Sequence, residues 1–173
     1  MQVLTRAGLL RLGAAATLGA VPPPDSDLAF VRLLIATELL ADDFYSHAIG
    51  AAAPGALHEA RANERAHYKG LAALMNEAGQ PPAQAGDIDF SYPAGSFANA
   101  GSIRTLGAAL EALQLGAYLG AADGLVSEPL RGLVARIAAN EAQHLTIFEP
   151  FRSSFPSAST IEQASGALSR YTG

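Results

Sequence analysis

Residues 62–67 read Ala-Asn-Glu-Arg-Ala-His and residues 139–144 read Ala-Asn-Glu-Ala-Gln-His, so the motif A-N-E-x-x-H occurs twice in this chain. In both copies the glutamate and the histidine are three residues apart, a spacing that places two side chains on one face of an α-helix. Each motif also lies on an apolar stripe of helical period, so its glutamate and histidine are expected to face the interior. Each segment is therefore predicted to be a helix that buries a carboxylate and an imidazole.

A second pair of segments repeats together with the first. Glu38 is followed seven residues later by Tyr45, and Glu111 is followed seven residues later by Tyr118. The order along the chain is Glu…Tyr, then Asn-Glu-x-x-His, and then both again. This order predicts two related helical hairpins about a pseudo-twofold axis, which contribute the same groups to one shared centre. The six side chains expected there are Glu38, Glu64, His67, Glu111, Glu141 and His144.

The rest of the sequence predicts how the helices are connected. Periodicity and capping residues predict helices over 26–50, 56–78, 102–123, 127–149 and 160–171. Ser127 is the expected N-cap of the fourth helix, and Thr160 and Gln163 have the spacing of a capping box. Short turns make each of the two pairs antiparallel, whereas residues 80–101 are rich in Pro and Gly and lack a sustained period. Two antiparallel pairs joined by one long crossover predict an all-α, ferritin-like four-helix bundle followed by a short C-terminal helix.

The composition limits the function classes. A formal net charge of -5 over 173 residues provides no basic surface for nucleic acid or an anionic membrane. The absence of cysteine excludes disulfides, thiolate metal sites and a cysteine nucleophile. A cationic partner such as a metal ion is compatible with this charge.

The chain is expected to divide into three parts. Residues 1–24 carry two arginines and a short apolar run before three prolines, which predicts an export signal or an N-terminal anchor. That run is too short to span a bilayer, so no transmembrane span is expected. Residues 25–152 form the predicted bundle, and residues 153–173 form a C-terminal extension. The expected location is therefore periplasmic or extracellular.

Four buried carboxylates predict bound cations. Burying them without counter-charge would cost more than the net stability of a domain. Two divalent ions bring four positive charges, which balance four carboxylates when both histidines are neutral. Oxygen and imidazole ligands without sulfur suit iron or manganese, and less selectively zinc. We expect two iron ions, with manganese as the alternative.

Two asparagines precede the histidines by one helical turn. Asn63 and Asn140 are expected to orient the imidazole rings through their amides, because metal-bound histidines usually have such a partner on the second ring nitrogen. The alternative for each is an ordinary asparagine on a helix surface.

Two tyrosines and one aspartate complete the candidates. Tyr45 and Tyr118 are the candidate catalytic residues, expected to hydrogen-bond ligand carboxylates or to supply electrons to an oxidised centre, with a plain core role as the alternative. Asp42 lies one turn beyond Glu38 and is expected to act as a base or a metal entry point, or else to be a solvated acid.

On these motifs the chain resembles the ferritin-like di-metal carboxylate superfamily, over about residues 26–150. Its ligand set is similar to that of bacterioferritin and rubrerythrin, and its leader, short loops and C-terminal helix resemble exported bacterial ferritin-like proteins related to desiccation-associated proteins. The resemblance implies that Glu38 and Glu111 are terminal ligands and that Glu64 and Glu141 bridge two metals. It further implies one histidine ligand for each metal.

The sequence also departs from these relatives. Bacterioferritin has a haem-binding methionine where this chain has Arg65, so no haem is expected. The lack of cysteine excludes a rubredoxin-type iron centre like that of rubrerythrin. The sequence leaves a homo-oligomer open and establishes no cage.

Two functions of different classes follow. The first is an O2- or peroxide-dependent oxidation at a di-iron or di-manganese centre, ferroxidase-like or peroxide-scavenging. The second is an exported stress or desiccation-related protein without enzymatic activity, in which the metals hold the bundle together or are sequestered.

Overall fold

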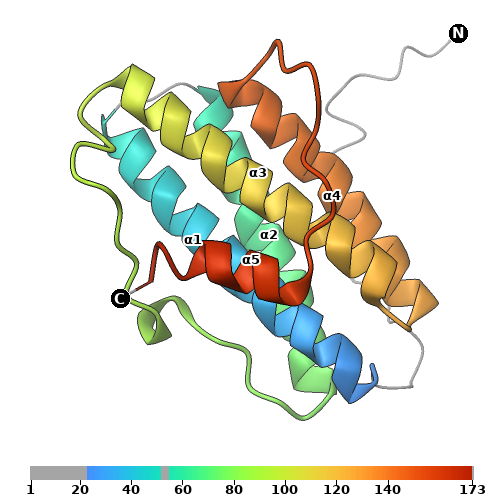
Figure 1. Cartoon of the computed structure of the whole chain (residues 1–173). Helices are drawn as coiled ribbons and strands as arrows, with labels where there is room; N and C mark the ends of the chain where they lie inside the picture. The colour runs from blue at the N-terminus through green and yellow to red at the C-terminus, as the bar shows by residue number, and fades with distance from the viewer. Residues whose placement is uncertain (1–22, 52–54, 173) are drawn as a thin grey trace, which may run out of the picture.

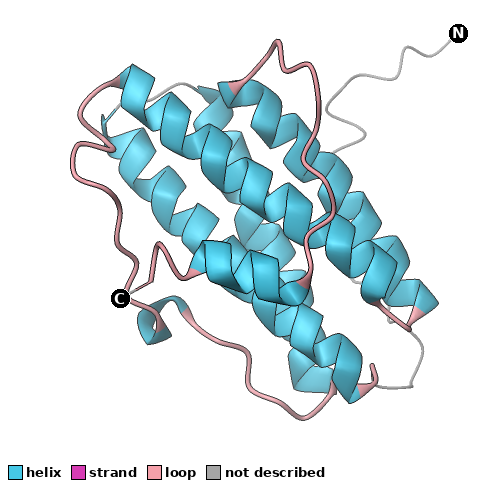
Figure 2. Ribbon diagram, viewed as in Figure 1, coloured by secondary structure: helices cyan, strands magenta, loops and turns pink. Residues whose placement is uncertain are grey.

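The computed structural model describes residues 23–51 and 55–172. Its helices are α1 (Asp25–Ala51), α2 (Gly55–Glu77), the 3-10 turn η2 (Ala85–Asp87), α3 (Ala100–Gly124), α4 (Glu128–Phe148) and α5 (Ile161–Leu168). The predicted all-α bundle is confirmed, and Figure 2 shows these helices joined by loops. The predicted export segment lies almost wholly outside the described residues. None of the helices in the described ranges has both the length and the apolar character that a bilayer crossing requires.

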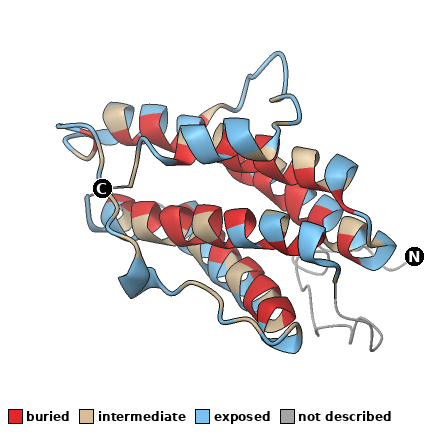
Figure 3. Ribbon diagram, turned by 60° about the horizontal axis from the view of Figure 1, so that its bottom comes forward, coloured by how far each residue is buried: buried red, intermediate tan, exposed pale blue. Residues whose placement is uncertain are grey.

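The four long helices form two packed pairs, α1 with α2 and α3 with α4 (Figure 1). α1 also packs on α3, and α5 lies across both of these helices. On each long helix the buried residues lie on the side toward the neighbouring helices and the exposed residues on the outer side (Figure 3). This arrangement follows from the helical period of the apolar residues, which gives every long helix one stripe to bury.

The crossover between α2 and α3 runs along the outside of the bundle (Figure 1). Two tyrosine hydroxyls attach it to the helices. The Tyr68 hydroxyl donates to the carbonyl of Ala83 at 3.0 Å, and the Tyr92 hydroxyl donates to Asp43 Oδ2 at 2.8 Å. Together with partly buried Phe90 and Phe97, these contacts attach the segment to the helices.

The last helix is shorter than the sequence predicts. It begins after Thr160, whose hydroxyl accepts from the Gln163 amide as the capping box predicts, but it ends at Leu168. The chain then pairs with the crossover, where the Ser91 amide donates to the Tyr171 carbonyl at 2.8 Å. The Ser169 amide still bonds to the carbonyl four residues back, but those of Arg170 and Tyr171 bond only three residues back. The α-helix thus becomes a turn after Leu168, so the prediction of a helix to about residue 171 was wrong.

A buried aspartate, rather than Ser127, caps α4. Ser127 occupies the N-cap position, but its side chain makes no capping hydrogen bond. The Asp27 carboxylate accepts from the backbone amides of Val126 and Ser127, each at 2.9 Å, and Asp27 is completely buried. It thereby satisfies two amides just before a helix whose first turn has amides without partners. The N-terminus of α4 is thus tied to the N-terminus of α1.

Close packing of the segment before α5 requires glycine on α3. The Ser159 amide donates to the Gly116 carbonyl at 2.9 Å. A Cβ at Gly120 would lie 1.8 Å from the Ser159 carbonyl oxygen, far inside van der Waals contact. The absence of a side chain at Gly120 therefore lets the C-terminal extension lie directly on the helix.

Candidate metal centre

The six side chains singled out by the repeat converge in the middle of the bundle. They come from all four long helices, and none is more than 4% exposed. Their potential ligand atoms form two sets, in each of which all the atoms lie within 4.8 Å of one another. The first set is Glu38, Glu64, His67 and Glu141, and the second is Glu64, Glu111, Glu141 and His144. Two carboxylates, Glu64 and Glu141, belong to both sets.

Each shared carboxylate presents one oxygen to each histidine. Glu141 Oε1 lies 2.9 Å from His67 Nδ1, and Glu141 Oε2 lies 3.2 Å from His144 Nδ1. Glu64 Oε1 lies 2.6 Å from His144 Nδ1, and Glu64 Oε2 lies 3.8 Å from His67 Nδ1. The two carboxylates therefore span the two sets. The pattern is the same from both hairpins, which supports the pseudo-twofold relation.

The tyrosines exchange partners between the hairpins. Tyr45 on α1 donates its hydroxyl to Glu111 Oε1 on α3, and Tyr118 on α3 donates to Glu38 Oε1 on α1. Both tyrosines are completely buried. Each hydroxyl occupies one oxygen of a glutamate and leaves the other directed to the centre.

Several atoms at this point have no hydrogen-bond partner among the described residues. They are Glu38 Oε2, Glu64 Oε1, His67 Nδ1, Glu111 Oε2 and Glu141 Oε1. Some of them approach one another closely, as His67 Nδ1 and Glu141 Oε1 do, but without the alignment of a hydrogen bond. Buried polar atoms almost always have partners, so a group of five directed at one place indicates a cation-binding position. The donor set of oxygens and imidazole nitrogens fits divalent metals.

The side chains alone hold protons that a metal would displace. Burial and the nearby Glu64 charge raise the pKa of Glu38 to about 8. The same two causes hold the pKa of Glu111 well above its usual value. Burial by itself would lower the pKa of His67 and His144, but the glutamate carboxylates close to their Nδ1 atoms outweigh it and raise both. A metal that bound here would therefore release protons.

The shared carboxylate Glu64 differs from the two terminal ones. Burial would raise its pKa and Glu141 acts in the same direction, but the nearby imidazoles of His144 and His67 leave the pKa of Glu64 below its usual value. Glu64 therefore carries its negative charge even before a cation binds.

Gln114 on α3 is a further residue of the centre that was not predicted from the sequence. Its side chain is 1% exposed, and Nε2 donates to Glu64 Oε2 at 2.9 Å. Gln114 lies three residues after Glu111, so the helical period could have identified it. The equivalent position after Glu38 is Ala41, which has no donor. The two halves of the centre are thus chemically different despite their similar ligands.

The asparagines lie near the centre in two different ways. Asn63 Nδ2 is 3.2 Å from His144 Nε2, so this amide meets the histidine of the opposite motif and not His67 of its own. Asn140 is buried at 7% exposure, but among the described residues its side chain makes no hydrogen bond to His67.

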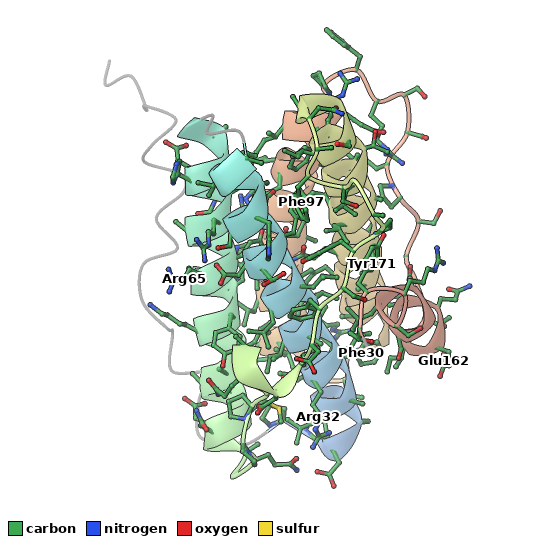
Figure 4. All side chains as sticks on the ribbon, turned by 90° about the vertical axis from the view of Figure 1, so that its left-hand side faces the viewer. Phe30, Arg32, Arg65, Phe97, Glu162 and Tyr171 are labelled. Carbon is green, nitrogen blue, oxygen red and sulfur yellow. The ribbon has the colours of Figure 1, made fainter. Side chains whose placement is uncertain are left out.

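Asp42 lies outside the group of ligand atoms. Its carboxylate accepts from Arg61 Nε at 2.8 Å and lies 3.9 Å from Arg65 Nε. Arg65 is exposed on the outer side of α2 (Figure 4). Asp42 is therefore a half-buried acid near Glu38 that is paired with arginine side chains. It is neither fully solvated nor part of the two groups of ligand atoms.

Comparison with known proteins agrees with this geometry. A family model described as ferritin-like domain matches residues 26–152. A search of curated proteins finds no match to the chain. The matched region begins in α1, ends after α4 and contains all six converging side chains.

Proposed function

Since this chain belongs to the ferritin-like domain family, we propose that it binds two metal ions, most suitably iron, and oxidises them with O2 or peroxide. The observation that carries this proposal is the pair of overlapping ligand sets that share Glu64 and Glu141. Shared carboxylates with one oxygen toward each half are what a two-metal site needs, whereas a single ion would leave half of these groups without a partner. Manganese is the alternative, because the same oxygen and nitrogen donors suit it.

The proposed ligands divide by their hydrogen bonds. Glu38 and Glu111 would each bind one metal through Oε2, because a tyrosine hydroxyl occupies Oε1. His67 and His144 would bind through Nδ1, the nitrogen that faces the carboxylates. For His144 the proton then lies on Nε2, and the Asn63 amide, turned so that its oxygen accepts, would hold the ring in place.

The protein supplies a dry, negatively charged site. Two ferrous ions would together provide the two electrons that, with two protons, reduce one hydrogen peroxide to two water molecules. Tyr45 and Tyr118 are the only hydroxyls that the described structure shows on the ligand carboxylates, so they are the proposed route for a proton or an electron to this site. The low exposure of all six ligand side chains keeps bulk water away from them.

A non-enzymatic role is the second candidate. The six ligands join α1, α2, α3 and α4, so two bound ions would crosslink the whole bundle whether or not they react. In that case an exported protein would use the metals for stability or would sequester them. The periplasmic or extracellular location is part of both proposals and rests on the leader-like residues 1–24 alone.

Metal content with and without the shared carboxylates tests the proposal. The variant is Glu64→Ala with Glu141→Ala, and its matched control is Glu59→Ala with Glu128→Ala, which removes one exposed glutamate from each of the same helices. We expect about two iron or manganese ions per chain in the wild type and the control, and none in the variant.

Rapid mixing of the Fe(II)-loaded protein with O2 or peroxide separates the two roles. A fast absorbance change that requires Glu64 and Glu141 supports an oxidative enzyme. Bound metal without turnover, together with a large fall in melting temperature on metal removal, supports the structural role. Equal metal content in the variant and the control refutes a metal centre at these residues.

A further inference from the structure

A surface pocket of about 190 Å³ lies directly above one half of the metal centre. Its walls come from α1, α2 and the crossover, and they include Glu38, Asp42, Arg65, Lys69 and Ala85. Glu38 itself is completely buried, so it forms a wall of this pocket without being open to water. Neither of the two larger pockets in the described structure is lined by one of the six ligands. The pocket thus approaches the centre from the Glu38 side.

The other half of the centre lies beneath an aromatic layer. The ring of Tyr45 is 6.3 Å from that of His144, 6.1 Å from that of Phe148 and 5.2 Å from that of Phe44. Tyr45, Phe44 and Phe148 are buried. In the other hairpin the positions equivalent to Phe44 and Phe148 hold the smaller residues Ala117 and Leu71. The pseudo-symmetry is therefore broken, with apolar rings over the Glu111–His144 half and a polar pocket over the Glu38–His67 half.

The charges of the pocket disfavour a cation. Arg65 and Lys69 line it, and its one surface carboxylate, Asp42, already accepts from Arg61 at 2.8 Å. Two positive side chains around a paired acid repel a divalent ion at the mouth, whereas a small uncharged molecule meets no such barrier.

We propose that this pocket is the entrance through which a small uncharged oxidant reaches the Glu38–His67 half of the centre. The inference rests on the proposed function, since it assumes metals at the six ligands. Movement of the Glu38 side chain about its hydrogen bond to Tyr118 opens the last step of the path, because Glu38 separates the pocket from the ligand atoms. The aromatic layer closes the opposite half, so the two metal positions differ in access.

Filling the pocket tests the entrance. Ala85 is exposed and lines the pocket on the crossover, so Ala85→Trp places a large ring over it. Ala85→Leu is a smaller second variant that fills less of the space. Ala135→Trp is the matched control, because Ala135 is equally exposed but lies on α4 away from this pocket. The probe is nitric oxide, a small uncharged ligand whose binding to Fe(II) is followed by absorbance without any turnover.

The entrance predicts a several-fold slower association of nitric oxide with the Fe(II)-loaded Ala85→Trp protein. Ala85→Leu should show a smaller slowing, and Ala135→Trp should match the wild type. An unchanged rate in both Ala85 variants, with wild-type iron content, overturns the entrance and leaves the metal centre standing. If Fe(II) loading slows as much as nitric oxide binding, the pocket admits cations and the restriction to uncharged molecules is wrong. A wild-type chain that binds neither iron nor manganese refutes the entrance and the proposed function together.

Discussion

Replacing Glu38 by glutamine should remove a large part of the pH dependence of stability in the metal-free protein. Burial and the Glu64 charge raise the pKa of Glu38 from 4.5 to about 8. Between these values the folded protein keeps the proton while the unfolded chain loses it, so a rise in pH favours unfolding. The stability that protonated Glu38 contributes is therefore fully present below its pKa in the unfolded chain, and it is lost as the pH rises through its pKa in the folded protein.

The magnitude follows from the same window. One proton held only by the folded state changes the free energy of unfolding by about 1.4 kcal/mol per pH unit. Glu38 alone should thus lower stability by about 3 to 4 kcal/mol between about pH 5 and about pH 8. Glu111, His67 and His144 have raised pKa values and act in the same direction. Glu64, whose pKa is lowered, changes the pH dependence of stability only near and below pH 4.5, outside this window.

Urea unfolding followed by circular dichroism measures the effect on protein freed of metal by a chelator. Wild type should become less stable at each step from about pH 5 to about pH 8, and Glu38→Gln should show a clearly smaller slope. Glu59→Gln, at an exposed position of α2, serves as the control and should keep the wild-type slope. Equal slopes for wild type and Glu38→Gln, or a wild type that gains stability with pH, would refute the reasoning.

Three further predictions concern hydrogen bonds and packing. Tyr118→Phe removes the hydroxyl that donates to Glu38 and should weaken metal binding by about tenfold. A metal titration measures the affinity, and circular dichroism checks that the helices remain. Unchanged affinity would contradict this role of Tyr118. Asp27→Ala should lower the free energy of unfolding by about 2 to 4 kcal/mol, because two amides at the start of α4 lose their acceptor. A loss under about 0.5 kcal/mol would contradict the capping role. Gly120→Ala should destabilise by about 1 to 3 kcal/mol through collision with the segment before α5. The control Gly132→Ala has its nearest atom at 3.7 Å and should instead stabilise α4 by about 0.5 to 1 kcal/mol, so equal effects in urea unfolding would exclude the collision.

The sequence was sufficient for features that depend on spacing within one helix. Glu64 and His67 are three residues apart on an apolar stripe, so their shared, inward direction follows from the helical period alone. The four long helices end within a few residues of their predicted bounds, and the crossover was identified from its Pro and Gly content. The C-terminal helix is shorter than predicted, because the chain turns after Leu168 and its Tyr171 carbonyl then accepts from the distant Ser91 amide.

Contacts between helices could not be obtained in this way. Nothing in the spacing tells that Tyr45 serves Glu111 rather than Glu38 on its own helix, or that Asn63 meets His144. Such pairs depend on how far each helix is rotated and shifted against its neighbour, which is decided by the packing of many side chains at once. The same holds for Asp27, which caps α4 from a position far away in the sequence.

The sequence by itself therefore determined which six carboxylate and imidazole side chains face the centre and that two similar hairpins supply them, because a repeated motif of helical period admits little else. The tertiary structure alone decided how the two halves differ. Gln114 donates to Glu64 where Ala41 has nothing to donate, and aromatic rings cover one half while a polar pocket adjoins the other. These differences arise because helix packing brings together residues that are distant in the chain, and their neighbours depend on three-dimensional position and not on sequence separation.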